Sequence, residues 1–85
     1  MNYLIGYDIS DNKIREVTFN KLKYLGYINI QKSIFFGFNI SNNIYEETKK
    51  MLENSFLDSY FIVKINSQDF ISNIVGYEDE NVIVI

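Results

Sequence analysis

Residues 3–26 read YLIGYDISDNKIREVTFNKLKYLG, a buried strand followed directly by a helix. Residues 3–9 are rich in β-forming side chains and apolar on both faces, which predicts a strand that is covered from both sides. Side chains alternate along a strand, so one face carries Tyr3, Ile5 and Tyr7, and the other carries Leu4, Gly6 and Asp8. A carboxylate at the end of such an apolar strand makes Asp8 the first candidate for chemistry, because a charge there is costly unless it is paired.

The helix after this strand is bounded by residues that favour helix ends. Ser10, Asp11 and Asn12 are turn and N-cap residues, and Gly26 stands where a C-terminal cap belongs. The spacing predicts a helix over residues 13–25, with an inward stripe formed by Ile14, Val17, Thr18, Leu22 and Leu25.

The rest of the chain alternates strands and helices. Residues 27–40 are β-prone but too many for one ordinary strand, so we expect either two strands meeting near Lys32 and Ser33 or one strand sharply bent there. We further expect helices over 44–54 and 67–74, and strands over 60–65 and 82–85.

This order of elements predicts an α+β fold, a ferredoxin-like βαββαβ sandwich with an extra C-terminal strand, in a single domain of residues 1–85. Two helices would cover one face of the sheet and leave the other bare. We expect a second copy of the chain to cover it, giving a homodimer through the sheet face. Residues 77–85 would exchange with or pack on the partner subunit, because a free apolar strand is an aggregation hazard.

The composition limits the chemistry. The 85 residues include neither cysteine nor histidine, which excludes thiolate metal sites and histidine-based nucleophile designs. Any metal must be held by oxygen, which favours magnesium, calcium or manganese. The net charge of −3 is unfavourable for nucleic-acid binding, but the first half carries the basic residues Lys13, Arg15, Lys21, Lys23 and Lys32. The sequence lacks a signal-peptide pattern and a membrane-spanning run, so we expect a cytoplasmic protein.

Three stretches are candidates for a site, and each has a plainer alternative. Asp8 is a candidate metal ligand, or it accepts backbone hydrogen bonds at the helix start. Lys13 and Arg15 lie where helix N–H groups attract phosphate, or they form a solvated helix face. Gln31 and Ser33, two apart, would share one side of a strand, while Phe35 either stacks on a base or belongs to the core.

Taken together, these stretches resemble the CRISPR-associated Cas2 family, the small dimeric partner of the CRISPR integrase. The resemblance rests on the run Tyr7-Asp8-Ile9-Ser10-Asp11, then Lys13 and Arg15, then Gly26, then Gln31-Lys32-Ser33-Ile34-Phe35-Phe36-Gly37. It implies a ferredoxin-like homodimer, and a magnesium-dependent endonuclease acting on RNA or DNA. It places the catalytic, metal-binding aspartate at Asp8. Supporting or nucleic-acid-binding positions fall on Tyr7, Ser10, Asp11, Lys13, Arg15, Gln31, Ser33 and Phe35.

The expected function is therefore CRISPR adaptation, with Mg²⁺ as cofactor and the integrase subunit and nucleic acid as partners. Two alternatives from the resemblance are a non-catalytic nucleic-acid-binding scaffold and a toxin-type ribonuclease of the virulence-associated D class, which shares the fold. A third, suggested by the acidic balance, is a dimeric interaction domain that binds no nucleic acid.

Overall fold

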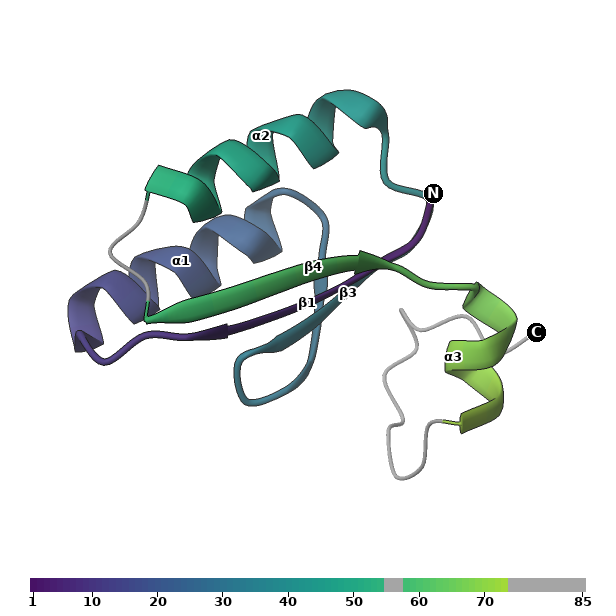
Figure 1. Ribbon diagram of the computed structural model, residues 1–85, viewed down its shortest axis with the longest axis horizontal. Helices are drawn as coiled ribbons and strands as arrows, with labels where there is room; N and C mark the ends of the chain where they lie inside the picture. Colours follow the sequence, from purple (N-terminus) through teal and green to yellow (C-terminus); the bar gives the residue numbers. More distant parts are fainter. Residues whose placement is uncertain (55–57, 74–85) are drawn as a thin grey trace.

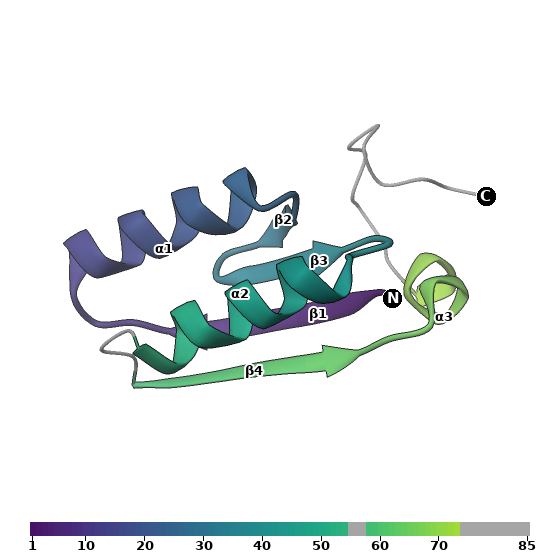
Figure 2. The same cartoon turned by 90° about the horizontal axis from the view of Figure 1, so that it is seen from above.

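The computed structural model describes residues 1–54 and 58–73, which form a four-stranded antiparallel sheet with helices on both of its faces (Figure 1). The elements follow in the order β1 (Tyr3–Asp8), α1 (Asn12–Tyr24), β2 (Ile28–Gln31), β3 (Ile34–Gly37), α2 (Asn42–Asn54), β4 (Ser59–Lys64) and α3 (Ser67–Asn73). The sheet order is β2-β3-β1-β4, and α1 and α2 lie side by side over one face (Figure 2). The α+β, ferredoxin-like prediction is confirmed. The expected strand at 82–85 and the exchanging segment 77–85 lie outside the described residues.

The strand β1 is central and pairs with β3 on one side and β4 on the other. Gly6 stands opposite Ile34 on β3 and opposite Phe61 on β4. A side chain at Gly6 would collide with Phe61, whose ring would lie 2.2 Å from an added Cβ. Glycine at this position therefore leaves room for the Phe61 ring to lie across β1.

Residues 28–37 form a hairpin, so the two-strand alternative holds. Its turn is Lys32 and Ser33, with Ser33 in the left-handed region at φ 62°. The expectation that Gln31 and Ser33 share one side of a strand is wrong, because Gln31 ends β2 while Ser33 belongs to the turn. A residue in the turn no longer follows the two-residue alternation of a strand.

The main core lies between the sheet and the two helices α1 and α2. It includes Tyr3, Ile5, Tyr7, Leu22, Phe35 and Leu52. The predicted inward stripe of α1 is confirmed for Thr18, Leu22 and Leu25 but wrong for Val17, which is 62% exposed. Val17 lies well to the side of the direction that the other stripe residues share, at 3.6 residues per turn.

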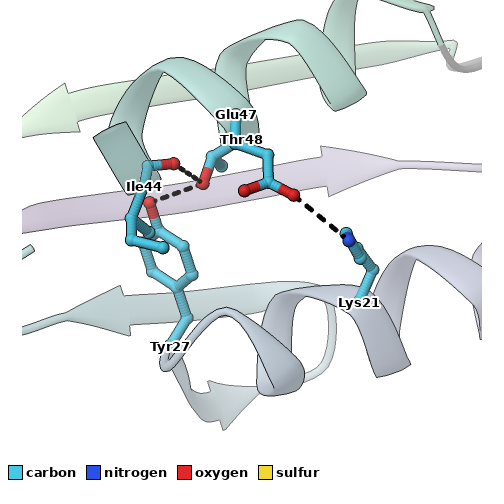
Figure 3. A network of polar contacts seen from close by, with 5 residues as sticks. All are labelled: Lys21, Tyr27, Ile44, Glu47 and Thr48. Atoms are coloured by element: carbon cyan, nitrogen blue, oxygen red, sulfur yellow. Dashed lines mark hydrogen bonds and ion pairs between the residues drawn. The ribbon is translucent and has the colours of Figure 1, made fainter. Parts of the chain in front are cut away.

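Two polar contacts tie α2 to the elements beneath and beside it (Figure 3). Tyr27 and Thr48 are hydrogen-bonded through their hydroxyls at 2.8 Å inside the core. Lys21 and Glu47 form an ion pair of 3.3 Å between the two helices. Because both of its members are partly exposed, this pair adds little to stability.

The opposite sheet face, called here the open face, is apolar and only partly covered. Phe70 of α3 stacks on Phe36 with ring centroids 4.1 Å apart, so α3 covers one end of this face. Farther along β4, Phe61 and Val63 are 42% and 46% exposed. Within the described parts of the chain, no helix has the length and apolar character needed to cross a bilayer.

Candidate metal and nucleic-acid site

Asp8 is the last residue of β1 and its side chain is exposed. It follows Leu4 and Gly6 on the open face, as the strand alternation predicts. On β4 its partner is Ser59, and its backbone carbonyl accepts a hydrogen bond of 3.0 Å from the backbone N–H of Asp58. A solvent-exposed carboxylate is therefore held at the end of a buried strand.

The loop after Asp8 is ordered by side chains. Asp11 caps α1, with its Oδ1 accepting from the backbone N–H of Ile14 at 2.9 Å. Arg15 reaches back along the helix to donate to the carbonyl of Ile9 at 3.3 Å and to Asn12 Oδ1. The hydroxyl of Ser10 donates to the carboxylate of Asp58. Ser10, Asp11 and Arg15 thus shape the loop that leaves Asp8.

A shallow groove of about 270 Å³ runs over the open face beside Asp8. Its lining includes Gly6, Asp8, Lys32, Ser59 and Phe61. An acidic, a basic and a hydroxyl side chain therefore meet at the edge of an apolar surface. Such a combination suits a metal ion together with a phosphate group better than it suits an apolar ligand.

A second groove, of about 460 Å³, lies between α1 and the turn of the β2–β3 hairpin. Arg15 and Lys32 supply two positive charges and Glu16 one negative charge, and Tyr7, Phe19 and Ser33 also line it. We call it the cationic groove. Lys32 and Ser33 line both grooves, so the hairpin turn separates one from the other.

Tyr7 stands between the cationic groove and the core. Burial raises the pKa of its phenol, while a hydrogen bond with Ser33 and the charge of Arg15 act in the opposite direction. The backbone N–H of Tyr7 also donates to the carbonyl of Ser33 at 3.2 Å. The phenol is therefore protonated at neutral pH and serves as a hydrogen-bonding group rather than a base.

Other residues expected at the site lie elsewhere. Lys13 lines a different groove, between α1 and α2, together with Val17 and Met51. Side chains two positions apart in a helix point in nearly opposite directions, so Lys13 and Arg15 line different grooves. Gln31 is exposed at the end of β2, where its carbonyl accepts from the Asn29 side chain at 2.7 Å.

Phe35 is fully buried, packed edge-on against Phe19 and stacked with Tyr7. Of the two alternatives for Phe35, base stacking and core packing, the structure supports core packing. Its ring packs against the ring of Tyr7 and is not accessible to a base.

The Asp8 carboxylate is a ligand of the kind that suits a hard cation such as magnesium. The described residues contain no group of three or more His, Cys, Asp or Glu side chains placed to hold a metal. Magnesium at phosphate-processing sites is often bound by one or two carboxylates together with substrate phosphates and water. Asp8 fits that type of site, provided a substrate or a second subunit supplies further oxygens.

Lys32 was named among the basic residues of the first half but was not assigned to the site, and Asp58 was missed. The sequence does indicate that Lys32 is available for binding, since a basic residue in the turn of a hairpin is exposed. It gives no such indication for Asp58, because that residue comes from a distant part of the chain and reaches the Asp8 loop only through the pairing of β1 with β4.

Comparisons with known proteins agree with this geometry. The sequence model described as CRISPR associated protein Cas2 matches residues 1–72. A protein named CRISPR-associated endoribonuclease Cas2 1, from Francisella tularensis subsp. novicida (strain U112), is 33% identical over 81 residues. The aligned region spans 92% of this chain and 82% of that relative. The match over residues 1–72 and the 33% identity to this relative show that the chain belongs to the Cas2 family of CRISPR-associated proteins.

Proposed function

We propose that a homodimer of this chain is a magnesium-dependent endonuclease that cuts phosphodiester bonds in RNA or DNA. The observation that carries the proposal is the position of Asp8, an exposed carboxylate on the open face with Lys32 lining the same groove. The relative's name, an endoribonuclease, makes RNA the first substrate to test.

The apolar open face supports the dimer. Phe61, opposite Gly6, and Val63, opposite Leu4, leave large apolar side chains exposed on this face. Covering this face with a second copy removes them from water and brings the two Asp8 residues toward the two-fold axis. Two carboxylates placed close together resist joint ionisation, and a divalent cation between them relieves the repulsion.

Each residue of the site would then have a separate role in binding or cleavage. Mg²⁺ bound at Asp8 would lower the pKa of a bound water and offset the charge of the attacked phosphate. Lys32 would hold the phosphate backbone beside Asp8, and Arg15 would hold the adjoining stretch in the cationic groove. Tyr7, protonated at neutral pH, would donate a hydrogen bond to the sugar-phosphate chain.

The test is cleavage of a labelled single-stranded RNA and of a DNA of the same sequence by wild type and by Asp8→Asn. We expect magnesium-dependent cleavage by the wild type, a loss of at least about a hundredfold in Asp8→Asn, and no cleavage with EDTA. Equal cleavage by the two proteins, or cleavage that EDTA leaves unchanged, would rule the proposal out.

A second candidate is a nucleic-acid scaffold that serves CRISPR adaptation with the integrase. It is favoured by the small number of metal-binding donors among the described residues and by the separate cationic groove. On this account Asp8→Asn preserves spacer acquisition, whereas the charge reversal Lys32→Glu abolishes it. The opposite pattern of effects favours the nuclease.

A further inference from the structure

We propose that Asp58 positions Asp8, and that it does so through Ser10. The proposal rests on the proposed role of Asp8 as a metal ligand. It adds Asp58, the residue directly before β4, to the residues that shape the site. Asp58 is a positioning residue in this account. It acts on the loop that carries the carboxylate and not on the phosphate or the metal.

Asp58 contacts the Asp8 loop twice. Its backbone N–H donates to the carbonyl of Asp8 at 3.0 Å, and its carboxylate accepts the hydroxyl hydrogen of Ser10, two residues farther on. The next residue, Ser59, is the strand partner of Asp8 itself. Asp58 therefore spans the point where β1 ends and the loop begins.

The strand pairing explains why the contact of Asp58 with the backbone of Asp8 matters for the position of Asp8. The partners of β1 on β3 run from Tyr3 opposite Gly37 to Gly6 opposite Ile34, whereas the pairing with β4 continues to Asp8. At Asp8 itself, the strand partner among the described residues thus comes from the β4 side alone. The backbone at Asp8 sets the direction in which its side chain leaves the strand, so the contacts that hold this backbone limit the positions that the carboxylate can reach.

The other loop residues have their own supports. Arg15 holds the carbonyl of Ile9, and Asp11 caps the helix by accepting from Ile14. Ser10 is held by Asp58. Removing the Ser10–Asp58 bond consequently frees one segment of the loop, the one between Asp8 and the cap, without disturbing the core.

Two other roles for Asp58 predict that different variants lose metal affinity. If Asp58 were a second metal ligand, or acted only through its negative charge, then Asp58→Asn would be as harmful as Asp58→Ala, and Ser10→Ala would be harmless. If it positions the loop, the oxygen that accepts from Ser10 matters and the charge does not. Asp58→Asn keeps such an oxygen, so it should restore what Asp58→Ala loses.

The experiment measures Mn²⁺ affinity by calorimetry for the full chain and for Ser10→Ala, Asp58→Ala, Asp58→Asn and the double alanine variant. We expect Ser10→Ala and Asp58→Ala each to weaken binding about tenfold, as outer-shell changes commonly do. The double variant should be no weaker than either single one, because both remove the same bond. Asp58→Asn should bind within about threefold of wild type. Wild-type affinity in Ser10→Ala, or an Asp58→Asn as weak as Asp58→Ala, overturns the proposal.

A second readout separates this inference from the proposed function. In the metal-free protein, the amide hydrogen of residue 58 should exchange about fivefold faster in Ser10→Ala, because the bond to the Asp8 carbonyl loses its support. The resonances of Asp8 should shift with it. If wild type binds no Mn²⁺, the metal site fails and the exchange measurement still decides whether Asp58 positions Asp8. Unchanged exchange in Ser10→Ala rejects the positioning role whatever the metal result.

Discussion

The Tyr27 hydroxyl donates its hydrogen to Oγ1 of Thr48, over 2.8 Å (Figure 3). The direction follows from the next bond, in which Thr48 donates its single hydroxyl hydrogen to the carbonyl of Ile44 at 2.7 Å. Tyr27 and Thr48 are both buried, so this chain of two bonds connects the start of β2 with the first turns of α2 inside the core.

The first prediction concerns this pair. Tyr27→Phe should lower the free energy of unfolding by about 1 kcal/mol, the value of one bond. Thr48→Val should cost about 1–3 kcal/mol, because it leaves the buried Tyr27 hydroxyl without its acceptor. The double variant should cost less than the sum. Urea unfolding at one fixed protein concentration measures all four proteins, and strictly additive costs would contradict a stabilising bond between Tyr27 and Thr48.

The second prediction concerns alkaline pH. Burial raises the pKa of Tyr27 and of Tyr7 above the usual value near 10. The unfolded chain therefore loses these protons at lower pH than the folded chain, so stability is intact below about pH 10 and falls as pH rises through the folded-state values. Unfolding followed from pH 8 upward should show this decline, and Tyr27→Phe should make it shallower. A stability that rises above pH 10 would contradict the burial of these phenols.

The third prediction concerns the open face. Val63→Glu should convert the proposed dimer into a monomer, because it places a charge within the apolar surface that the second copy covers. Val17→Glu is the matched control, since Val17 is also an exposed valine but lies on α1 at the other side of the sheet. Sedimentation of both variants measures the result. A dimer that survives Val63→Glu and dissociates with Val17→Glu would place the interface on the helices.

The fourth prediction concerns Lys32. Lys32→Gln should weaken binding to a nucleic-acid duplex several-fold and reduce the slope of log affinity against log salt by about one for each phosphate that Lys32 neutralises. Lys49→Gln is the control, because Lys49 and Lys50 share their stretch of α2 with three acids, Glu46, Glu47 and Glu53, which offset the attraction for phosphate. Gel shifts over a salt series give both slopes. Equal slopes in the two variants would exclude Lys32 as a phosphate-binding residue.

The local patterns of the sequence predicted most of the fold. The alternation along β1 put Tyr3, Ile5 and Tyr7 on one face, which the structure shows to be the core face. The expected cap residues included Asp11, which caps α1. Such predictions succeed because strand period and helix capping depend on neighbours in the chain. The predicted inward stripe of α1 was wrong at Val17, because apolar character alone does not show which side of the helix a side chain occupies.

The site was harder to predict, since its parts come from separate elements. Asp8 and Arg15 were candidates from the end of the strand and the start of the helix, and the family resemblance pointed to the same residues. The contacts of Asp58 with Asp8 and Ser10, however, depend on the register between β1 and β4. The same register puts the Phe61 ring across Gly6. No single stretch of sequence contains that register, because it forms between segments some fifty residues apart.

The central claim is that two copies of β1 bring their Asp8 residues together across the open face. The chain has no cysteine, so Asp8→Cys introduces a single thiol whose proximity to its twin can be measured by short thiol crosslinkers. Lys50→Cys, on the exposed side of α2, is the control. The account predicts rapid crosslinking into covalent dimers at position 8 and little at position 50. Efficient crosslinking at position 50 with none at position 8 would contradict it.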